Sequence, residues 1–182
     1  IIIAYAMVKL ACAQANNKLG LLEDKIFNPI VSACEMIING EFHDQFIVEI
    51  IQGGAGTSTN MNANEVIANV ALEIIGKEKG DYEVISPLTH VNMSQSTNDT
   101  YPTALLVGFL KEYDPLLEAI KALSDSFYAK GVEFSGVIKM GRTQLQDAVP
   151  MTLGQEFTAF GYTLLDDIKR LNEMSQLFLE VN

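Results

Sequence analysis

Hydrophobic residues recur every three or four positions along most of this chain, which is the period of an amphipathic helix. The pattern predicts helices over residues 1–19, 23–39 and 60–75, and a glycine stands at or just after the end of each. Glycine is favoured there because it adopts left-handed backbone angles without strain. Strand-like alternation is nearly absent, so the chain is predicted to be all-α, or mainly helical.

A fourth helix is predicted to begin near Pro102, since proline is well suited to the first turn of a helix. Pro115 should kink or break this helix because it removes a backbone donor and clashes with the preceding turn. The apolar stripe then continues to Gly131. Residues 131–150 form the one non-helical stretch, with a short strand expected over residues 134–140.

The last helix has a clear start signal after Pro150, where Thr152 and Gln155 fit a capping box. Its apolar stripe continues to the end of the chain, and a helix of about 29 residues would be about 43 Å long. Such a helix needs comparable helices beside it, most simply in a bundle. We therefore expect an N-terminal mainly helical domain over residues 1–97 and the beginning of a helical-bundle domain over residues 98–182.

Composition narrows the classes of function. The chain has 182 residues and a formal net charge of −11, which argues against nucleic-acid binding because that depends on basic surface. Its apolar runs are far shorter than the ~18–20 residues that span a bilayer. Cys12 and Cys34 lie in apolar stripes and are expected to be free buried thiols of a reducing compartment. The chain starts abruptly within a helical pattern, so we expect a cytoplasmic protein of which this is one part.

The stretch "GGAGTSTNMNANE", residues 53–65, places glycines and small polar side chains ahead of an apolar helix. Such loops often bind anions through backbone N–H groups. A nucleotide site is not supported, because the lysine of a phosphate-binding loop and the third glycine of a dinucleotide fingerprint are missing. Four asparagines in or near this helix are unusual because asparagine is a poor helix former. They either cap the helix and face solvent or contribute to a site: Asn60, Asn62, Asn64 and Asn69.

Two further polar clusters are "QSTNDTYPT", residues 95–103, and "KMGRTQLQDAVP", residues 139–150. The first can be explained locally as a helix N-cap, and the second as a polar turn with a paired arginine. Taken together, the three clusters supply hydroxyl, amide and N–H donors without a nucleophile–base pair or a metal-binding set. This inventory suits the recognition of small carboxylates and amines rather than covalent hydrolysis.

The stretches "GGAGTSTNMNANEVIAN", "HVNMSQSTNDTYPT" and "KMGRTQLQDAVPMTLGQEF" closely resemble the bacterial aspartate ammonia-lyases of the aspartase/fumarase superfamily. The resemblance runs over the whole chain and covers well under half of a typical member. It implies the first helices of the family's central bundle, a homotetramer with shared active sites, and the reversible elimination of ammonia from L-aspartate to give fumarate. It implies no required cofactor, with magnesium ions as an activator in some relatives.

The resemblance also implies roles for individual residues. In the family reaction a base removes the Cβ proton, and hydrogen-bond donors stabilise the resulting aci-carboxylate. Carried over by position, Thr57 would contact the β-carboxylate and the amino group, and Ser96 and Thr97 would bind the β-carboxylate. Asn98 would bind the departing amine, and Thr143 would hold the α-carboxylate. Gln144 would lie beside the amino group.

Three departures from the family pattern matter. Many relatives, fumarases included, have histidine at Gln144; a neutral amide cannot donate a proton at physiological pH, so Gln144 should orient rather than act as an acid. Leu88 and Thr89 replace a more polar pair, so a secondary carboxylate site is doubtful there, and His90 is expected to be structural. The family's serine base lies in a GSSxMPxKxN loop that these residues do not contain. No catalytic residue is therefore assigned, and the isolated chain is expected to be inactive.

Two alternatives remain open at this stage. One is class II fumarate hydratase, which shares the superfamily scaffold and interconverts fumarate and L-malate. The other is a non-catalytic helical assembly module that kept the fold without the chemistry.

Overall fold

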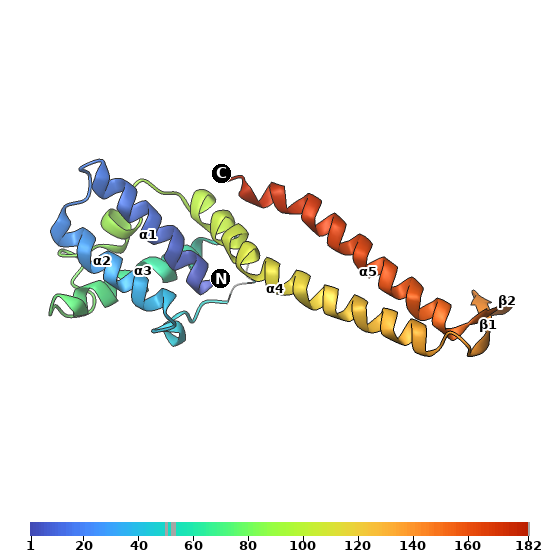
Figure 1. Ribbon diagram of the computed structural model, residues 1–182. Helices are drawn as coiled ribbons and strands as arrows, with labels where there is room; N and C mark the ends of the chain where they lie inside the picture. The colour runs from blue at the N-terminus through green and yellow to red at the C-terminus, as the bar shows by residue number, and fades with distance from the viewer. Residues whose placement is uncertain (50, 52–53, 182) are drawn as a thin grey trace. The chain divides into compact units, whose positions relative to one another are not determined.

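The computed structural model describes residues 1–49, 51 and 54–181 (Figure 1). Gly53, the first residue of the glycine-rich stretch, lies outside the described residues. The chain forms two compact units, which divide between Phe109 and Leu110. Unit 1 runs from Ile1 to Phe109 and includes the last residues from Glu180, and unit 2 is Leu110–Leu179. The expected domains, 1–97 and 98–182, stay a prediction.

Unit 1 contains three helices close to their predicted positions, α1 (Ile2–Lys18), α2 (Asp24–Ile38) and α3 (Thr57–Ile74). Helix α2 packs between α1 and α3. Short helical turns, η1 (His43–Gln45) and η2 (Pro87–Val91), lie in the connections. The core is made mainly by aliphatic residues that recur along the three helices: Ala13, Ile26, Ile30, Ala33, Cys34, Ile37, Val66, Ile67, Val70, Ala71 and Leu72.

Glycines end these helices as predicted. Gly40 follows α2 with a φ of 100°, and Gly76 follows α3 with a φ of 72°. Both angles lie in the left-handed region that favours glycine. The two cysteines are free, as expected, but only Cys34 is buried and Cys12 is half-buried.

Helix α4 (Thr97–Glu133) corrects two predictions. It begins five residues before Pro102, and it continues through Pro115, so of the predicted kink or break the break is wrong. Pro115 lies on the exposed side of the helix, where water can satisfy the carbonyl group that its missing N–H leaves unpaired. Solvation thus offsets the local penalty of the proline.

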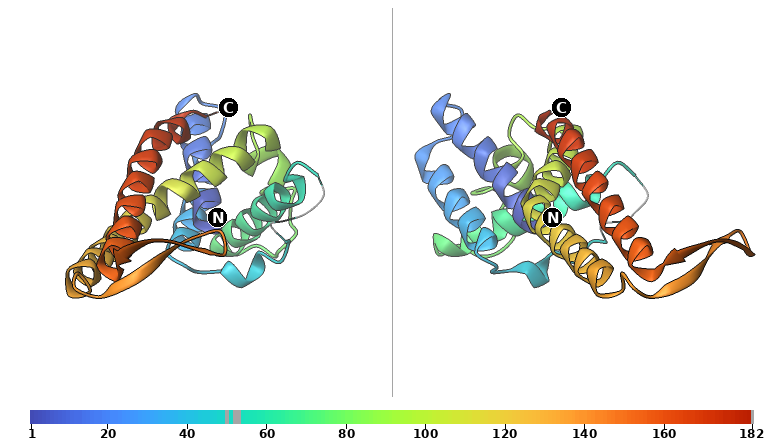
Figure 2. Two further views of the ribbon diagram at one scale, coloured as in Figure 1. Left: turned by 90° about the vertical axis from the view of Figure 1, so that its right-hand side faces the viewer. Right: turned by 45° about the vertical axis from the view of Figure 1, so that its right-hand side comes forward.

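In unit 2 the last turns of α4 run antiparallel to α5 (Leu153–Ser175), as Figures 1 and 2 show. Ser124 Oγ donates to the Gly161 carbonyl at 3.0 Å, and Tyr113 Oη donates to Asn172 Oδ1 at 2.9 Å. The rings of Phe127 and two phenylalanines of α5 pack with centroid distances of 5.9 and 5.6 Å.

An antiparallel hairpin joins these two helices, with strands β1 (Ile138–Thr143) and β2 (Gln146–Thr152). It projects from their ends in Figure 2. The predicted strand over residues 134–140 overlaps β1 only in part, and β2 was not predicted, because a proline and exposed polar residues obscure its alternation. The mainly helical fold class is confirmed, with this hairpin as its one sheet among the described residues.

The capping box at the start of α5 is confirmed. The Gln155 N–H donates to Thr152 Oγ1 at 3.1 Å, and the Thr152 N–H donates to Gln155 Oε1 at 2.9 Å. Helix α5 is shorter than predicted, because it ends at Ser175 and the 3₁₀ turn η3 (Gln176–Leu179) follows it.

Unit 2, all of whose residues the structure describes, buries only small side chains. Its buried residues are Ser124, Gly131, Gly141, Gly154 and Gly161. Many of its large hydrophobic residues are exposed: Leu116, Leu123, Ile138, Leu145, Val149, Phe160, Met174 and Leu177. The helices of unit 2 therefore meet through glycines and partly buried aromatic rings, and many of its large apolar side chains are uncovered in this single chain.

Gly154→Ala should loosen the start of α5, because an added Cβ would lie 2.4 Å from the Gly131 carbonyl oxygen and 2.8 Å from Ser135 Cα. Backbone atoms cannot move aside easily, so we expect a cost of about 2 kcal/mol. Amide hydrogen exchange along α5 measures it, with about 30-fold faster exchange expected. Gly136→Ala is the control, since its Cβ would meet no atom within 4 Å. Equal exchange in the two variants would contradict the prediction.

Candidate active site

The starts of α3 and α4 contact each other. Gly56 precedes α3 with a φ of 80°, and a Cβ there would lie 2.4 Å from the ring of Tyr101 on α4. One turn into α3, Asn60 Nδ2 donates to Thr97 Oγ1 at 3.2 Å. The Thr100 hydroxyl donates back to Asn60 Oδ1 at 3.0 Å. These contacts bring two of the three sequence motifs together within unit 1.

Ser96 caps α4 through reciprocal hydrogen bonds. Its Oγ accepts from the Asn98 N–H at 3.2 Å, and its own N–H donates to Asp99 Oδ2 at 2.7 Å. Ser96 is thus an N-cap whose hydroxyl accepts from the second residue of the helix, and the aspartate at the third position accepts from the Ser96 N–H. The local explanation of this motif as an N-cap is thus confirmed. Since the Ser96 oxygen serves as the acceptor, its hydroxyl hydrogen remains available for another partner.

Four predicted binding residues lie at these two helix starts. Thr57 is the first residue of α3, Ser96 directly precedes α4, and Thr97 and Asn98 are the first two residues of α4. Thr97 is half-buried, whereas the other three are exposed. Helix N-termini carry partial positive charge and N–H groups without intrahelical acceptors. Two such ends with hydroxyl side chains suit a carboxylate ligand.

The other two predicted residues lie in unit 2, at the end of the hairpin. Thr143 is the last residue of β1, and Gln144 begins the turn with a φ of 53°. A left-handed conformation is uncommon for a residue other than glycine, and such residues cluster at functional sites. An exposed ion pair between Arg142 and Asp147, with 2.7 Å between Nη1 and Oδ1, spans the same turn.

The asparagines of α3 have different environments, which the sequence did not reveal. Asn60 and Asn64 are buried, at 2% and 0% exposure, and both donate to Asn92 Oδ1 at 3.1 Å. Asn62 binds the loop before α3, donating to the Gln45 carbonyl at 3.1 Å and accepting from the Val48 N–H at 3.2 Å. Asn69 accepts from the Gly80 N–H at 2.8 Å. None of the four is only a solvent-facing residue.

Lys9 lies near this site but outside the three sequence motifs, so it was not predicted to belong to the site. It lies in α1 with 0% exposure, and its Nζ donates to Asn92 Oδ1 at 3.0 Å and to Gln95 Oε1 at 2.8 Å. Among the residues that the structure describes, no carboxylate lies within ion-pair distance of this ammonium. The only available signal was a lysine within the apolar stripe of residues 1–19.

Burial lowers the pKa of Lys9 to about 7, because the apolar surroundings disfavour its charged form. The Cys12 and Cys34 thiols are near enough to oppose this effect in part. Burial also raises the pKa of both thiols, that of Cys34 to about 12, so they stay neutral near pH 7.

This shift predicts that stability rises with pH. The unfolded chain keeps Lys9 protonated up to its ordinary pKa of 10.5, whereas the folded chain releases the proton near pH 7. The unfolded state therefore binds more protons between these values, and the Lys9 contribution to stability grows as pH increases. From pH 7 to pH 9 the gain should be about 2 kcal/mol.

Urea unfolding at both pH values measures this gain. Lys9→Met should lack it, and Lys18→Met, a change at an exposed lysine of the same helix, should retain it. Ionisation of the thiols in the unfolded state acts in the opposite direction but is common to all three chains. The same pH dependence in Lys9→Met as in the unchanged chain would disprove the assignment.

His90 has a structural role, as expected. Its Nδ1 accepts a hydrogen bond from the Ser86 N–H at 2.9 Å within the η2 turn. The imidazole is therefore the tautomer with its hydrogen on Nε2. Partial burial lowers the pKa of His90, which keeps the ring neutral near pH 7.

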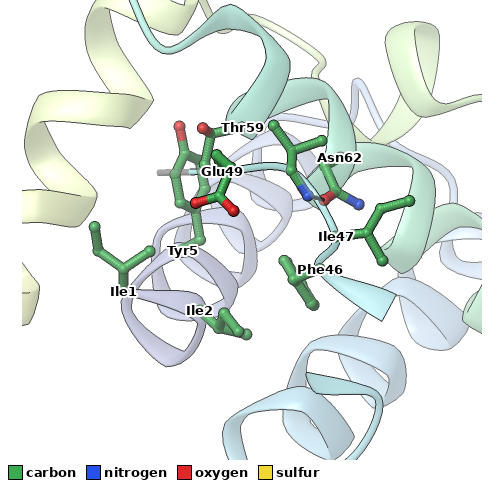
Figure 3. Close-up of a pocket in the computed structure, with 9 residues that line it drawn as sticks. Ile1, Ile2, Tyr5, Phe46, Ile47, Glu49, Thr59 and Asn62 are labelled. Carbon is green, nitrogen blue, oxygen red and sulfur yellow. Dashed lines mark hydrogen bonds between the residues drawn. The ribbon is translucent and has the colours of Figure 1, made fainter. Parts of the chain in front are cut away.

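A cavity of about 230 Å³ lies in unit 1 (Figure 3). Tyr5, Phe46, Glu49 and Thr59 are among its lining residues, but none of the six predicted binding residues is. The Tyr5 hydroxyl is buried, which raises its pKa, and the nearby Thr100 hydroxyl offsets this in part. Of the glycine-rich motif, Thr59 and Asn62 line this cavity.

No group of three or more His, Cys, Asp or Glu side chains in residues 1–49, 51 and 54–181 is arranged to hold a metal ion. Within the same residues, the structure contains no helix that is both long enough and apolar enough to cross a lipid bilayer.

Comparison with known proteins identifies the family. Residues 2–182 match the family described as "Lyase", and the chain belongs to this lyase family. It is 58% identical to an aspartate ammonia-lyase of Pseudomonas aeruginosa over 183 residues, which cover 100% of this chain and 39% of the relative. An aspartate ammonia-lyase of Bacillus subtilis is 55% identical over 98% of this chain and 38% of its own length. The chain thus spans about two-fifths of the curated relatives it matches.

Solved structures of related lyases also match the fold of this chain. The fumarate lyase:delta crystallin from Brucella melitensis, in its native form, matches with a TM-score of 0.91 and 56% identity, covering 100% of this chain and 42% of that one. A class II fumarase from Schistosoma mansoni matches with a TM-score of 0.83 and 35% identity, covering 99% of this chain and 38% of that one. The resemblance drawn from the three motifs is confirmed.

Proposed function

We propose that this chain is part of an aspartate ammonia-lyase, which reversibly eliminates ammonia from L-aspartate to give fumarate. The observation that carries the proposal is the contact between two helix starts that present Thr57, Ser96, Thr97 and Asn98. The 50–58% identity to proteins named aspartate ammonia-lyase supports the choice of substrate.

In this reaction a base removes the Cβ proton, and negative charge grows on the β-carboxylate. The Ser96 and Thr97 hydroxyls and the N–H groups at the start of α4 stabilise that charge, since fixed dipoles need no reorientation as the charge develops. Thr57 contacts the same carboxylate and the amino group, and Asn98 binds the departing amine. Thr143 holds the α-carboxylate, and Gln144 orients the amino group.

The elimination as proposed uses protein donors and requires no cofactor, with magnesium ions as an activator at most. We further propose a homotetramer in the cytoplasm, with active sites shared between subunits. The uncovered apolar side chains of unit 2 support association, because exposed apolar surface of this kind marks an interaction site. L-Aspartate, fumarate and ammonia are then its small-molecule partners, without nucleic acid or membrane.

Fumarate hydratase is the second candidate, and the similarity to the Schistosoma mansoni class II fumarase favours it. Both reactions form a carbanion beside a carboxylate and differ in the leaving group. Adding fumarate with ammonia, or fumarate in water alone, to the intact protein separates them by whether aspartate or malate forms. A non-catalytic assembly module would form neither product.

Thr97→Val in the intact protein should lower kcat/KM for L-aspartate by about 10²–10³-fold, because it removes one donor to the developing charge. Thr97→Ser keeps the hydroxyl and should stay within about 10-fold of the unchanged protein. Fumarate formation, followed by ultraviolet absorbance, gives these values. Thr89→Val changes an exposed threonine in the η2 turn and serves as the control. Unchanged activity in Thr97→Val would refute the assigned role.

The 182-residue chain alone should not form fumarate from L-aspartate, because the family's serine base loop is not among its residues. The same absorbance assay, run beside the intact protein, tests this expectation. Turnover by the isolated chain close to that of the intact protein would show that the base lies within these residues.

A further inference from the structure

The buried Lys9 has no role in the reaction proposed above, yet its hydrogen bonds lead toward the predicted site. A lysine ammonium has three N–H donors and no acceptor. The two side-chain amides that meet it, those of Asn92 and Gln95, must therefore both turn their oxygen atoms toward Nζ. With the opposite orientation, an NH₂ group would face a buried positive charge.

Hydrogen bonds to both the oxygen and the nitrogen of the Asn92 side-chain amide then fix its orientation. Its Oδ1 accepts from Lys9, Asn60 and Asn64, at 3.0, 3.1 and 3.1 Å, and its Nδ2 donates to the Gln95 carbonyl at 3.0 Å. Gln95 is held similarly, because its Nε2 donates to the Val91 carbonyl at 3.0 Å. The ammonium thus fixes which face of each amide donates and which accepts.

The orientation of Asn92 in turn determines the orientation of the Asn60 side-chain amide. Its Nδ2 faces Asn92 Oδ1 and Thr97 Oγ1, and its Oδ1 accepts from the Thr100 hydroxyl at 3.0 Å. Reversing the Asn60 amide would place two amide oxygens against each other, which is costly in a buried setting. Asn60 must therefore donate to Thr97 as long as Asn92 presents its oxygen.

Thr97 is the last residue in this series. Its oxygen accepts the Asn60 N–H at 3.2 Å, so the hydroxyl hydrogen is not used in that bond. A hydroxyl whose oxygen is already occupied by a donor is set to donate to a further acceptor. A carboxylate is such an acceptor, whereas an ammonium or an N–H group is not.

We propose that Lys9 is a positioning residue: through the amides of Asn92 and Asn60, its buried ammonium sets the Thr97 hydroxyl to donate to a bound carboxylate. This inference rests on the proposed function for the identity of the ligand. The orientation of the amides does not depend on that function. Lys9 touches neither the substrate nor the reacting atoms in this scheme, and it acts only through the series Lys9, Asn92, Asn60, Thr97.

The first test measures amide orientation in the 182-residue chain, without activity. Lys9→Met keeps the length of the side chain and removes the ammonium. The side-chain amide NMR signals of Asn92, Gln95 and Asn60 should shift, whereas those of Asn69, outside this series, should not. Lys18→Met, in the same helix, should leave all four in place. Unchanged Asn60 and Asn92 signals in Lys9→Met would overturn the proposal.

If Lys9→Met does not fold, a pH titration of the unchanged chain, followed by NMR, tests the same proposal. Cys12 on α1 and Cys34 on α2 are the titratable groups that face Lys9, and burial raises the pKa of both thiols, so they stay neutral near the pKa of Lys9, about 7. Asp99 is the acidic side chain that acts on Cys12. The carboxamide carbon signals of Asn92 and Asn60 should shift with the same midpoint as the Lys9 Cε signal. Asn60 signals that do not follow Lys9 would overturn the series.

The second test is a double-mutant cycle in the intact protein, with succinate as the probe of carboxylate binding because it has no amine and does not react. At pH 6, where Lys9 is mostly protonated, Lys9→Met should weaken succinate binding by about 10-fold, the loss expected when a hydrogen bond to a charged group is misdirected. In a Thr97→Val background the same change should have almost no further effect, because the hydroxyl on which it acts is gone. Additive losses would mean that Lys9 does not act through Thr97 and would overturn the proposal.

The two tests separate the two claims. An intact protein that binds neither succinate nor fumarate and forms no product refutes the proposed function. The amide signals of the 182-residue chain then decide alone whether Lys9 orients Asn60. Amide signals that respond as expected together with an additive binding cycle would leave the function standing and reject the link from Lys9 to Thr97.

Discussion

A buried ammonium surrounded by amides is the interaction on which the arrangement of unit 1 depends. Burying a charge without a counter-ion is costly, and hydrogen bonds to polar groups offset only part of that cost. In the part of the chain that the structure describes, Lys9 finds amide oxygens from the segment just before α4. Because Asn92 also accepts from two asparagines of α3, one oxygen atom ties α1, α3 and the approach to α4 together. The positions of both helix starts therefore follow from a polar contact, in addition to the aliphatic core.

The parts of the fold that could be predicted from sequence are those with local causes. Helix ends at Gly40 and Gly76 follow from backbone freedom, and the start of α5 follows from a capping box made by residues three apart. The errors have non-local causes. Helix α4 continues through Pro115 because solvent can reach the unpaired carbonyl. Strand β2 exists because β1 lies beside it, which no pattern within residues 146–152 reveals.

In the candidate site, too, the residues with local sequence signals could be predicted, and those positioned by distant contacts could not. The hydroxyls at the starts of α3 and α4 could be named from motifs, because glycine-rich loops and N-caps have recognisable sequences. Lys9 could not, since a lysine in an amphipathic helix is normally assigned to the exposed face. The contact between Asn60 and Asn92 joins residues far apart in the sequence. A single sequence does not show which distant residues pair in this way. It therefore does not distinguish the asparagines of α3, although their environments differ.

The glycine contacts of unit 2 have a consequence for how the chain folds. Residues 110–179 fully bury only glycines and one serine, and Phe127, Phe134 and Phe157 are half-buried, so unit 2 gains less free energy from its own packing than unit 1 gains from its core. Unit 1, by contrast, has a continuous aliphatic core. Folding should therefore be hierarchical: unit 1 forms first as a cooperative nucleus, and the helical hairpin gains most of its stability when further apolar surface covers it. Subunit concentration would then control the completeness of folding as well as the state of assembly.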